Sequence, residues 1–137
     1  MGDPSIRYYD GLNNTPALPL AFDGHAELRR DGLVTNTVIL QWDQEAVVAF
    51  DGDEPVGVIV FQNAKWLKTC LIILSYVRPE ARRRGFYRRL LEEVRHRARL
   101  AGMVMLESNT HVRNGNLLAA AEALDRKRSA YVFIETL

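Results

Sequence analysis

The feature that most constrains the fold is an apolar run that leads through a short arginine-rich loop into an amphipathic stretch. Residues 71–77 are apolar enough to form a strand buried on both faces, and Pro79 ends strand pairing because it lacks an N–H donor. From residue 86 onward, apolar side chains recur every three or four positions, with arginine and glutamate between them. This pattern predicts a helix from residue 86 to Gly102, where a helix is expected to end. The chain therefore contains a strand–loop–helix unit.

The loop of this unit, Arg82-Arg83-Arg84-Gly85, has the chemistry of an anion site. The first N–H groups of a helix have no partner within the helix, and the positive end of its dipole lies behind them. Cations there oppose the dipole at a cost of about 0.3–1 kcal/mol each, so three of them beside a glycine indicate that an anion binds. The alternative is a solvated basic turn without a ligand.

Further elements follow from the same patterns. Residues 47–50 and 56–61 are predicted strands of a hairpin, with an Asp-Gly turn at 51–54. The second half adds a strand at 103–106, a helix at 116–127 and a last strand at 130–134. The first third is weakly patterned and predicts a strand at 6–9, a helix at 21–30 and a short strand at 38–40.

Composition limits the class of protein. A chain of 137 residues predicts one domain, residues 1–137, and its net charge of +1 does not indicate a surface coated by nucleic acid. No run approaches the ~18 apolar residues that span a bilayer, and residues 1–7 lack a signal peptide's apolar core. We therefore expect a cytoplasmic protein that uses neither a membrane nor a metal. Cys70 lies alone in an apolar run and is expected to be buried.

A family resemblance rests on the loop and its surroundings. Val77-Arg78-Pro79-Glu80, followed by Arg82 and Gly85, is similar to the coenzyme A signature of the GNAT superfamily of acyltransferases. In that family a central strand ends in Val-x-Pro-Glu, and Arg/Gln-x-x-Gly-x-Gly/Ala opens a helix. The resemblance covers residues 46–137. It implies an α/β (α+β) fold with a mixed central sheet flanked by helices, a strand–loop–helix cradle for coenzyme A, and acetyl-CoA as co-substrate.

The resemblance also implies which residues contact the coenzyme. The end of the strand, at Ser75, Tyr76 and Val77, would bind the pantetheine arm and polarise the thioester through its backbone. The loop and helix start would bind the phosphates, and an asparagine at the start of the last helix would contact pantetheine. The phosphate residues would be Arg82, Arg83, Arg84, Gly85, Phe86 and Tyr87, and the asparagine would be Asn116, with Asn114 as the other choice. Tyr87 departs from the family, which has a small residue there.

The sequence matches the family's catalytic residues less completely than its coenzyme A signature. The family's base is often a glutamate on a central strand, and the candidates here are Glu107 and His111. The family's proton donor is a tyrosine in the last helix, but residues 117–128 contain none, and Tyr131 is the nearest phenol. Water could protonate the departing thiolate instead.

Three functions are compatible with these residues. The first is an N-acetyltransferase that transfers an acetyl group from acetyl-CoA to an amine of a small molecule or protein. The second is a coenzyme A-binding module of the same fold that has lost catalysis. The third is a nucleic-acid binder using the basic helix, against which Glu92 and Glu93 count because they lie on that helix. The apolar residues 131–134 also suggest a strand edge that could pair in a homodimer.

Overall fold

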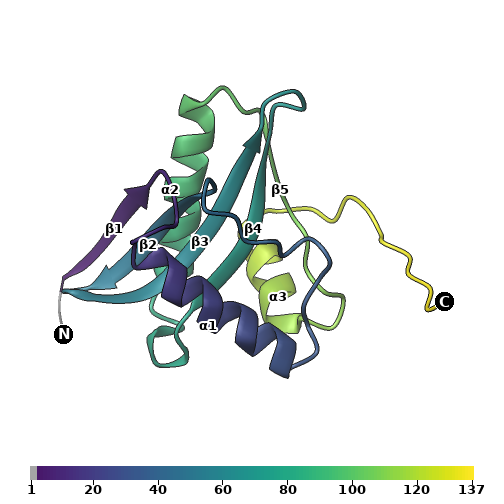
Figure 1. Cartoon of the computed structure of the whole chain (residues 1–137), viewed down its shortest axis with the longest axis horizontal. Coiled ribbons are helices and arrows are strands. Elements are labelled where there is room, and N and C mark those ends of the chain that lie inside the picture. Colours follow the sequence, from purple (N-terminus) through teal and green to yellow (C-terminus); the bar gives the residue numbers. More distant parts are fainter. Residues whose placement is uncertain (1–2) are drawn as a thin grey trace.

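The computed structural model describes residues 3–137, which form a five-stranded sheet with three α-helices (Figure 1). The strand order is β1-β2-β3-β4-β5; strands β1 to β4 are antiparallel neighbours, and β5 is parallel to β4. The strands are β1 (Pro4–Tyr9), β2 (Glu45–Asp51), β3 (Glu54–Ala64), β4 (Thr69–Val77) and β5 (Met105–Ser108). The helices are α1 (Ala17–Arg30), α2 (Phe86–Leu100), α3 (Gly115–Ala123) and a 3-10 turn, Pro79–Ala81. The predicted mixed sheet flanked by helices is confirmed.

The sheet separates two apolar cores, because side chains alternate between its faces. In β2, Val47 and Ala49 pack with residues of α2, whereas Val48 and Phe50 pack with residues of α1. Figure 1 shows α1 in front of the sheet and α2 behind it. A strand buried on both faces reads as a continuous apolar run, which is why β2, β3 and β4 are recognisable in the sequence.

A β-bulge in β4 interrupts this alternation. Val60 of β3 lies opposite Leu74 and Phe61 lies opposite Ile72, so Ile73 is an extra residue without an opposite partner. As a result Ile72 packs in the α2 core, while Leu74, two positions later, packs in the α1 core. The bulge therefore changes the direction in which the second half of β4 presents its side chains and backbone groups.

The pairing of β4 with β5 ends next to this bulge. The paired positions run from Thr69 opposite Met105 to Ile72 opposite Ser108. Beyond Ile72, β4 continues to Val77, and its only strand partner among the described residues is β3. The two strands thus separate, and one edge of the second half of β4 is open.

Two predicted strands do not form. Residues 38–40 lie in the connection after α1, where the Val38 and Ile39 amides donate to Thr35 and Thr37 carbonyls in local turns. Val38 and Leu40 still pack against the α1 core, so their apolar character serves packing rather than pairing.

The chain after α3 is also without a strand. Residues 130–134 extend from the body with exposed side chains and pair with no described strand, so the edge proposed for a homodimer is not present (Figure 1). A strand needs a hydrogen-bonding neighbour, and an apolar run alone does not supply one. The homodimer itself stays a prediction.

Other boundaries differ by a few residues. Helix α1 begins at Ala17 rather than 21, since Pro19 in its first turn loses no helical hydrogen bond. Strand β5 begins at Met105 rather than 103, and α3 ends at Ala123 rather than 127. Met1 and Gly2, which belong to the segment 1–7 weighed as a signal peptide, lie outside the described residues. None of the helices within residues 3–137 combines the length and apolarity needed to cross a bilayer.

Gly24 allows α1 to pack closely on β4, and this contact gives a test of the fold. A Cβ at position 24 would lie 2.7 Å from Cβ of Tyr76, so Gly24→Ala should lower the free energy of unfolding by about 1–3 kcal/mol despite alanine's better helix propensity. Gly115→Ala is the matched control, because a Cβ there meets nothing within 4 Å. Urea unfolding of both variants measures the difference. Equal stability of the two would contradict the close approach.

Candidate active site

The start of α2 exposes backbone donors. Gly85 is the N-cap residue with φ of 83°, no side chain caps the first turn, and no acidic residue lies in that turn. A Cβ at Gly85 would meet nothing within 4 Å, so the backbone conformation, not space, favours glycine here. The free N–H groups and the helix dipole together make a site for an anion.

The three loop arginines have different surroundings. Arg82 forms an ion pair with Glu27 of α1 at 2.7 Å and donates through Nε to the Val77 carbonyl at 2.8 Å. Arg84 pairs with Asp51 of the β2–β3 turn at 3.0 Å. Arg83, with φ of 63°, is exposed, and its side chain makes no ion pair or hydrogen bond with the described residues. Two arginines therefore hold the loop in place, and Arg83 is available to a ligand.

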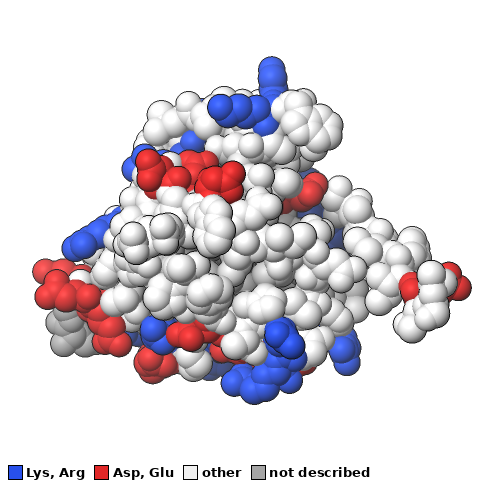
Figure 2. All heavy atoms as spheres, in the orientation of Figure 1, with Lys and Arg blue, Asp and Glu red and all other residues white. Residues whose placement is uncertain are grey.

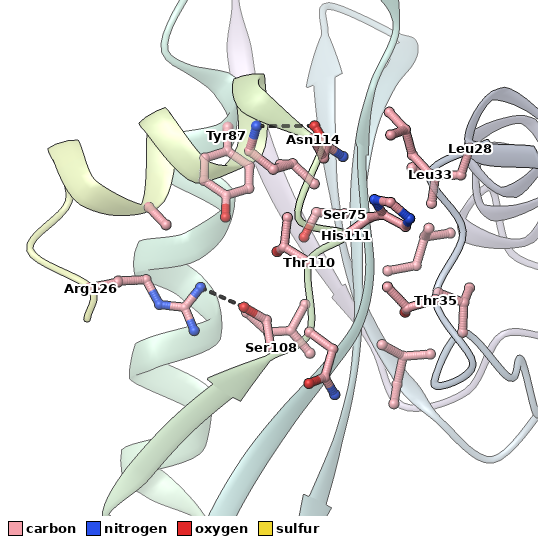
Figure 3. A pocket seen from close by; sticks show the side chains of 17 residues that line it. Leu28, Leu33, Thr35, Ser75, Tyr87, Ser108, Thr110, His111, Asn114 and Arg126 are labelled. Atoms are coloured by element: carbon pink, nitrogen blue, oxygen red, sulfur yellow. Dashed lines mark hydrogen bonds between the residues drawn. The ribbon is translucent and has the colours of Figure 1, made fainter. Parts of the chain in front are cut away.

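A narrow passage lies where β4 and β5 separate (Figure 3). It encloses about 40 Å³ and is reached by polar side chains from several elements. Ser75 comes from β4, His111 and Asn114 from the segment after β5, and Tyr87 from the first turn of α2. Arg126, beyond α3, donates to the Ser108 hydroxyl at 2.9 Å on the same side as Tyr87. On the other side the lining includes Leu28, Leu33 and Thr35, so the passage crosses the plane of the sheet.

A larger hollow of about 440 Å³ adjoins this passage. It is bounded by the connection after α1, by β3 and by the ends of the strand pair, and it includes Glu107. The passage and the hollow share Ile72, Ile73 and Asn109. The bulged residue Ile73 therefore lies where the two cavities meet. Two molecules bound one in each would approach one another there.

The structure brings several of the predicted site residues together. Ser75, Tyr87 and His111 line the passage, and Glu107 lines the hollow. The His111 Nδ1 accepts a hydrogen bond from the Arg113 amide at 3.1 Å, which leaves Nε2 to carry the proton of a neutral ring. Phe86 is buried in the α2 core.

The side chains of Tyr76 and Val77 pack in the two cores and line neither cavity. Tyr76 packs with the α1 core, with the Arg82 guanidinium 5.9 Å from its ring centre, and Val77 packs with the α2 core. Burial raises the pKa of the Tyr76 phenol, so it stays protonated at neutral pH. The role predicted for these two residues used only their backbone, and the Val77 carbonyl is already bonded to Arg82.

The asparagine that caps α3 is Asn114, not Asn116. The Asn114 side chain accepts from the Leu117 amide at 3.3 Å, is buried and lines the passage, whereas Asn116 is exposed in the helix. Gly115 follows the cap as the first helical residue, which shifts the helix start by one position from the prediction.

Sequence reasoning missed much of the hollow. Its wall contains Asn36, Gln41 and Gln44 from a connection with no periodic pattern, and Gln62 and Asn109 from strand ends. Arg126 was also missed, because its proximity to Ser108 depends on how the chain turns after α3. Within residues 3–137, no three side chains of the kind that bind metals gather in one place.

Comparison with known proteins gives one family and one fold. The sequence model of the acetyltransferase (GNAT) family matches residues 14–124. No curated protein sequence matches the chain.

Three solved structures illustrate the likeness in fold. Aminoglycoside N-acetyltransferase AAC(6')-Iy in complex with CoA has a TM-score of 0.73 at 15% identity, over 100% of this chain and 96% of that one. An IAA acetyltransferase from Bacillus cereus has a TM-score of 0.70 at 21% identity, over 89% and 75%. An aminoglycoside acetyltransferase from an uncultured soil metagenomic sample, in complex with sisomicin, has a TM-score of 0.71 at 14% identity, over 98% and 96%.

Cys70 is expected to be inert in the native protein. Its side chain is buried, and burial raises the pKa of the thiol to about 12, so almost no thiolate exists at pH 8. Reaction with 5,5′-dithiobis(2-nitrobenzoate) should be roughly a hundredfold or more slower in the folded protein than in urea. Labelling at equal rates in the two states would contradict this burial.

Proposed function

Because the chain belongs to the GNAT acetyltransferase family, we propose that it transfers an acetyl group from acetyl-CoA to the amine of an acceptor. The single observation that carries this proposal is the meeting of two cavities at the bulged residue Ile73. One cavity begins beside an anion site and crosses the sheet, while the other opens on the opposite side near a carboxylate. This arrangement suits a long anionic donor and a separate acceptor.

The chain's own residues fit the phosphate end of coenzyme A. The free amides at the start of α2 and the guanidinium of Arg83 favour a pyrophosphate, and no carboxylate in the first turn repels it. Arg82 and Arg84 fix the loop through Glu27 and Asp51. When bound, the coenzyme supplies a thioester whose carbonyl carbon is open to attack by an amine.

The pantetheine arm would use the open edge of β4. Within residues 3–137 no strand pairs with residues 73–77 on that side, so backbone groups there can bond to the arm's amides as a neighbouring strand would. Ile73 has no opposite partner in β3 and lines the passage, and in this proposal a backbone N–H at the bulge stabilises the charge that develops on the thioester oxygen. Asn114 and Ser75 add polar side chains along the same passage.

Glu107 is the base in this proposal. Glu107 lies on β5 and lines the acceptor hollow. Its partner in the register is Leu71, which lies two residues before the bulged Ile73. A carboxylate there can take a proton from an ammonium group and leave the neutral amine that attacks the thioester. His111 lines the passage instead of the hollow. The departing thiolate needs no residue on α3, because a thiol with a pKa near ~8.5 can take its proton from water.

The anion site is tested by substitution at Gly85. Gly85→Glu should weaken coenzyme A binding by more than about 100-fold, because a carboxylate would lie among the donors for the phosphates. Gly102→Glu is a matched control, since Gly102 has φ of 82°, follows the other end of α2 and also has nothing within 4 Å of a Cβ. Each variant should lose about 1–2 kcal/mol of stability through its positive φ.

Isothermal titration with coenzyme A measures both variants. Wild-type affinity in Gly85→Glu would place the phosphates elsewhere. Equal losses in the two variants would show that the backbone strain, and not the added carboxylate, is responsible.

Catalysis is tested by Glu107→Gln. This variant should lower kcat for amine acetylation by about 100-fold or more while coenzyme A affinity stays unchanged, since the residue lines only the acceptor hollow. Glu122→Gln is the control, because Glu122 lies on α3 and lines neither cavity. Thiol release during turnover measures both.

Two results would change the assignment. Full activity in Glu107→Gln together with loss in His111→Gln would move the base to the passage. Coenzyme binding by the wild-type protein without thiol release for any amine would identify a binding module that has lost catalysis.

A further inference from the structure

The hollow that contains Glu107 has an unusual distribution of charge for a site that would take an amine. Among the described residues that line it, Glu107 is the only one with an acidic or basic side chain. The rest are carboxamides, one hydroxyl and aliphatic side chains: Asn36, Thr37, Ile39, Gln41, Gln44, Gln62, Leu71, Ile72, Ile73 and Asn109. The site therefore offers one negative charge among many uncharged donors and acceptors.

Gln44 makes this polar wall rigid. Its side chain is buried, and its Nε2 donates to the Ile39 carbonyl at 2.9 Å and to Gln62 Oε1 at 3.4 Å. Its Oε1 accepts from the Gln41 amide at 2.9 Å. These bonds hold the connection before β2 against β3. They also occupy the Gln62 Oε1, which accepts from Gln44. The Gln62 amide nitrogen then remains as a donor for a bound molecule.

Charge is unevenly distributed on the face of the molecule that carries α1. Figure 2 shows the face that carries α1, where uncharged surface occupies the middle and Lys, Arg, Asp and Glu gather mainly toward the margins. The aliphatic side chains of Ile72 and Ile73, at the junction with the passage, give the hollow one apolar side. Such a wall favours a molecule with a hydrocarbon face.

We propose that the acceptor is a small monoamine that carries uncharged hydroxyl or amide groups, such as an amino sugar, and not a polycation. This inference rests on the proposed acetyl transfer and names its acceptor class. One ammonium group pairs with Glu107, and the carboxamides bond to the neutral polar groups. A second or third ammonium group would find no further carboxylate among the described lining residues. The relative solved with sisomicin shares the fold, but its acceptor does not carry over at 14% identity.

The test compares three amines: glucosamine with one amino group, spermidine with three, and the aminoglycoside sisomicin. We expect the wild-type kcat/KM to be at least about tenfold higher for glucosamine than for either polycation. Affinity for the three amines is measured as well, by titration in the presence of coenzyme A, so that the acceptor class can be judged even without turnover.

Gln62→Glu supplies the decisive variant. A glutamate there can still accept from Gln44 Nε2, and it gives the hollow a second carboxylate. It should shift the ratio of spermidine to glucosamine, in kcat/KM or in affinity, by about tenfold toward spermidine. Asn13→Asp is the matched control, because Asn13 is exposed and does not line the hollow, so the same added charge should leave the ratio unchanged.

The outcomes separate the two proposals. Binding of glucosamine over polycations without any acetylation would overturn the acetyl transfer but support the acceptor class. Acetylation or binding that favours spermidine or sisomicin in the wild-type protein would overturn the acceptor class alone. Failure of glucosamine to bind would also overturn the acceptor class. An equal spermidine-to-glucosamine ratio in Gln62→Glu and Asn13→Asp would do the same.

Discussion

The extra residue in β4 is the constraint on which the rest of the site depends. In a regular strand, Ile72 and Leu74 would lie on the same face, but with Ile73 inserted they pack in opposite cores. Pairing with β5 ends at Ile72, directly before the bulge. One residue thus separates a fully paired half of β4, which anchors the sheet, from a half whose edge is open. Both cavities include Ile73 because this is where the sheet parts.

The arginines of the loop at residues 82–84 differ in whether they pair with carboxylates of the protein. Three arginines at a helix start indicate an anion ligand, yet Arg82 and Arg84 are already paired with Glu27 and Asp51. These carboxylates come from α1 and from the end of β2, so the pairs tie the loop to a helix and to the sheet. Because they are partly exposed, such pairs hold geometry more than they add stability. In the proposed function, the attraction for the phosphates of coenzyme A therefore comes from the amides at the start of α2 and from Arg83.

Prediction from sequence succeeded where local pattern and tertiary role agree. The Asp-Gly hairpin and α2 were recognisable because their turn residue and their apolar period are local properties. Residues 38–40 and 130–134 were read wrongly as strands, since an apolar run says that a segment can pack but not that a pairing partner is near. The N-cap of α3 is Asn114, two residues before the predicted Asn116, because the helix begins at Gly115. The bulge has no sequence signal, since Ile73 sits in a run of similar residues.

The difference between regular elements and irregular segments also bears on the proposed acceptor side. Family and fold say least about the residues of this side. The donor side is built from β4, the loop and α2, which are regular elements with readable patterns. The acceptor side is built from the connection between α1 and β2, whose shape is set by a few bonds to Gln44 and by packing of Val38 and Leu40. Side chains there can change without disturbing the sheet, because few of them belong to the cores. In the proposed function, specificity for an acceptor is carried by the carboxamides of this connection and by Glu107 of β5. The fold beneath them is shared with an aminoglycoside acetyltransferase and an IAA acetyltransferase.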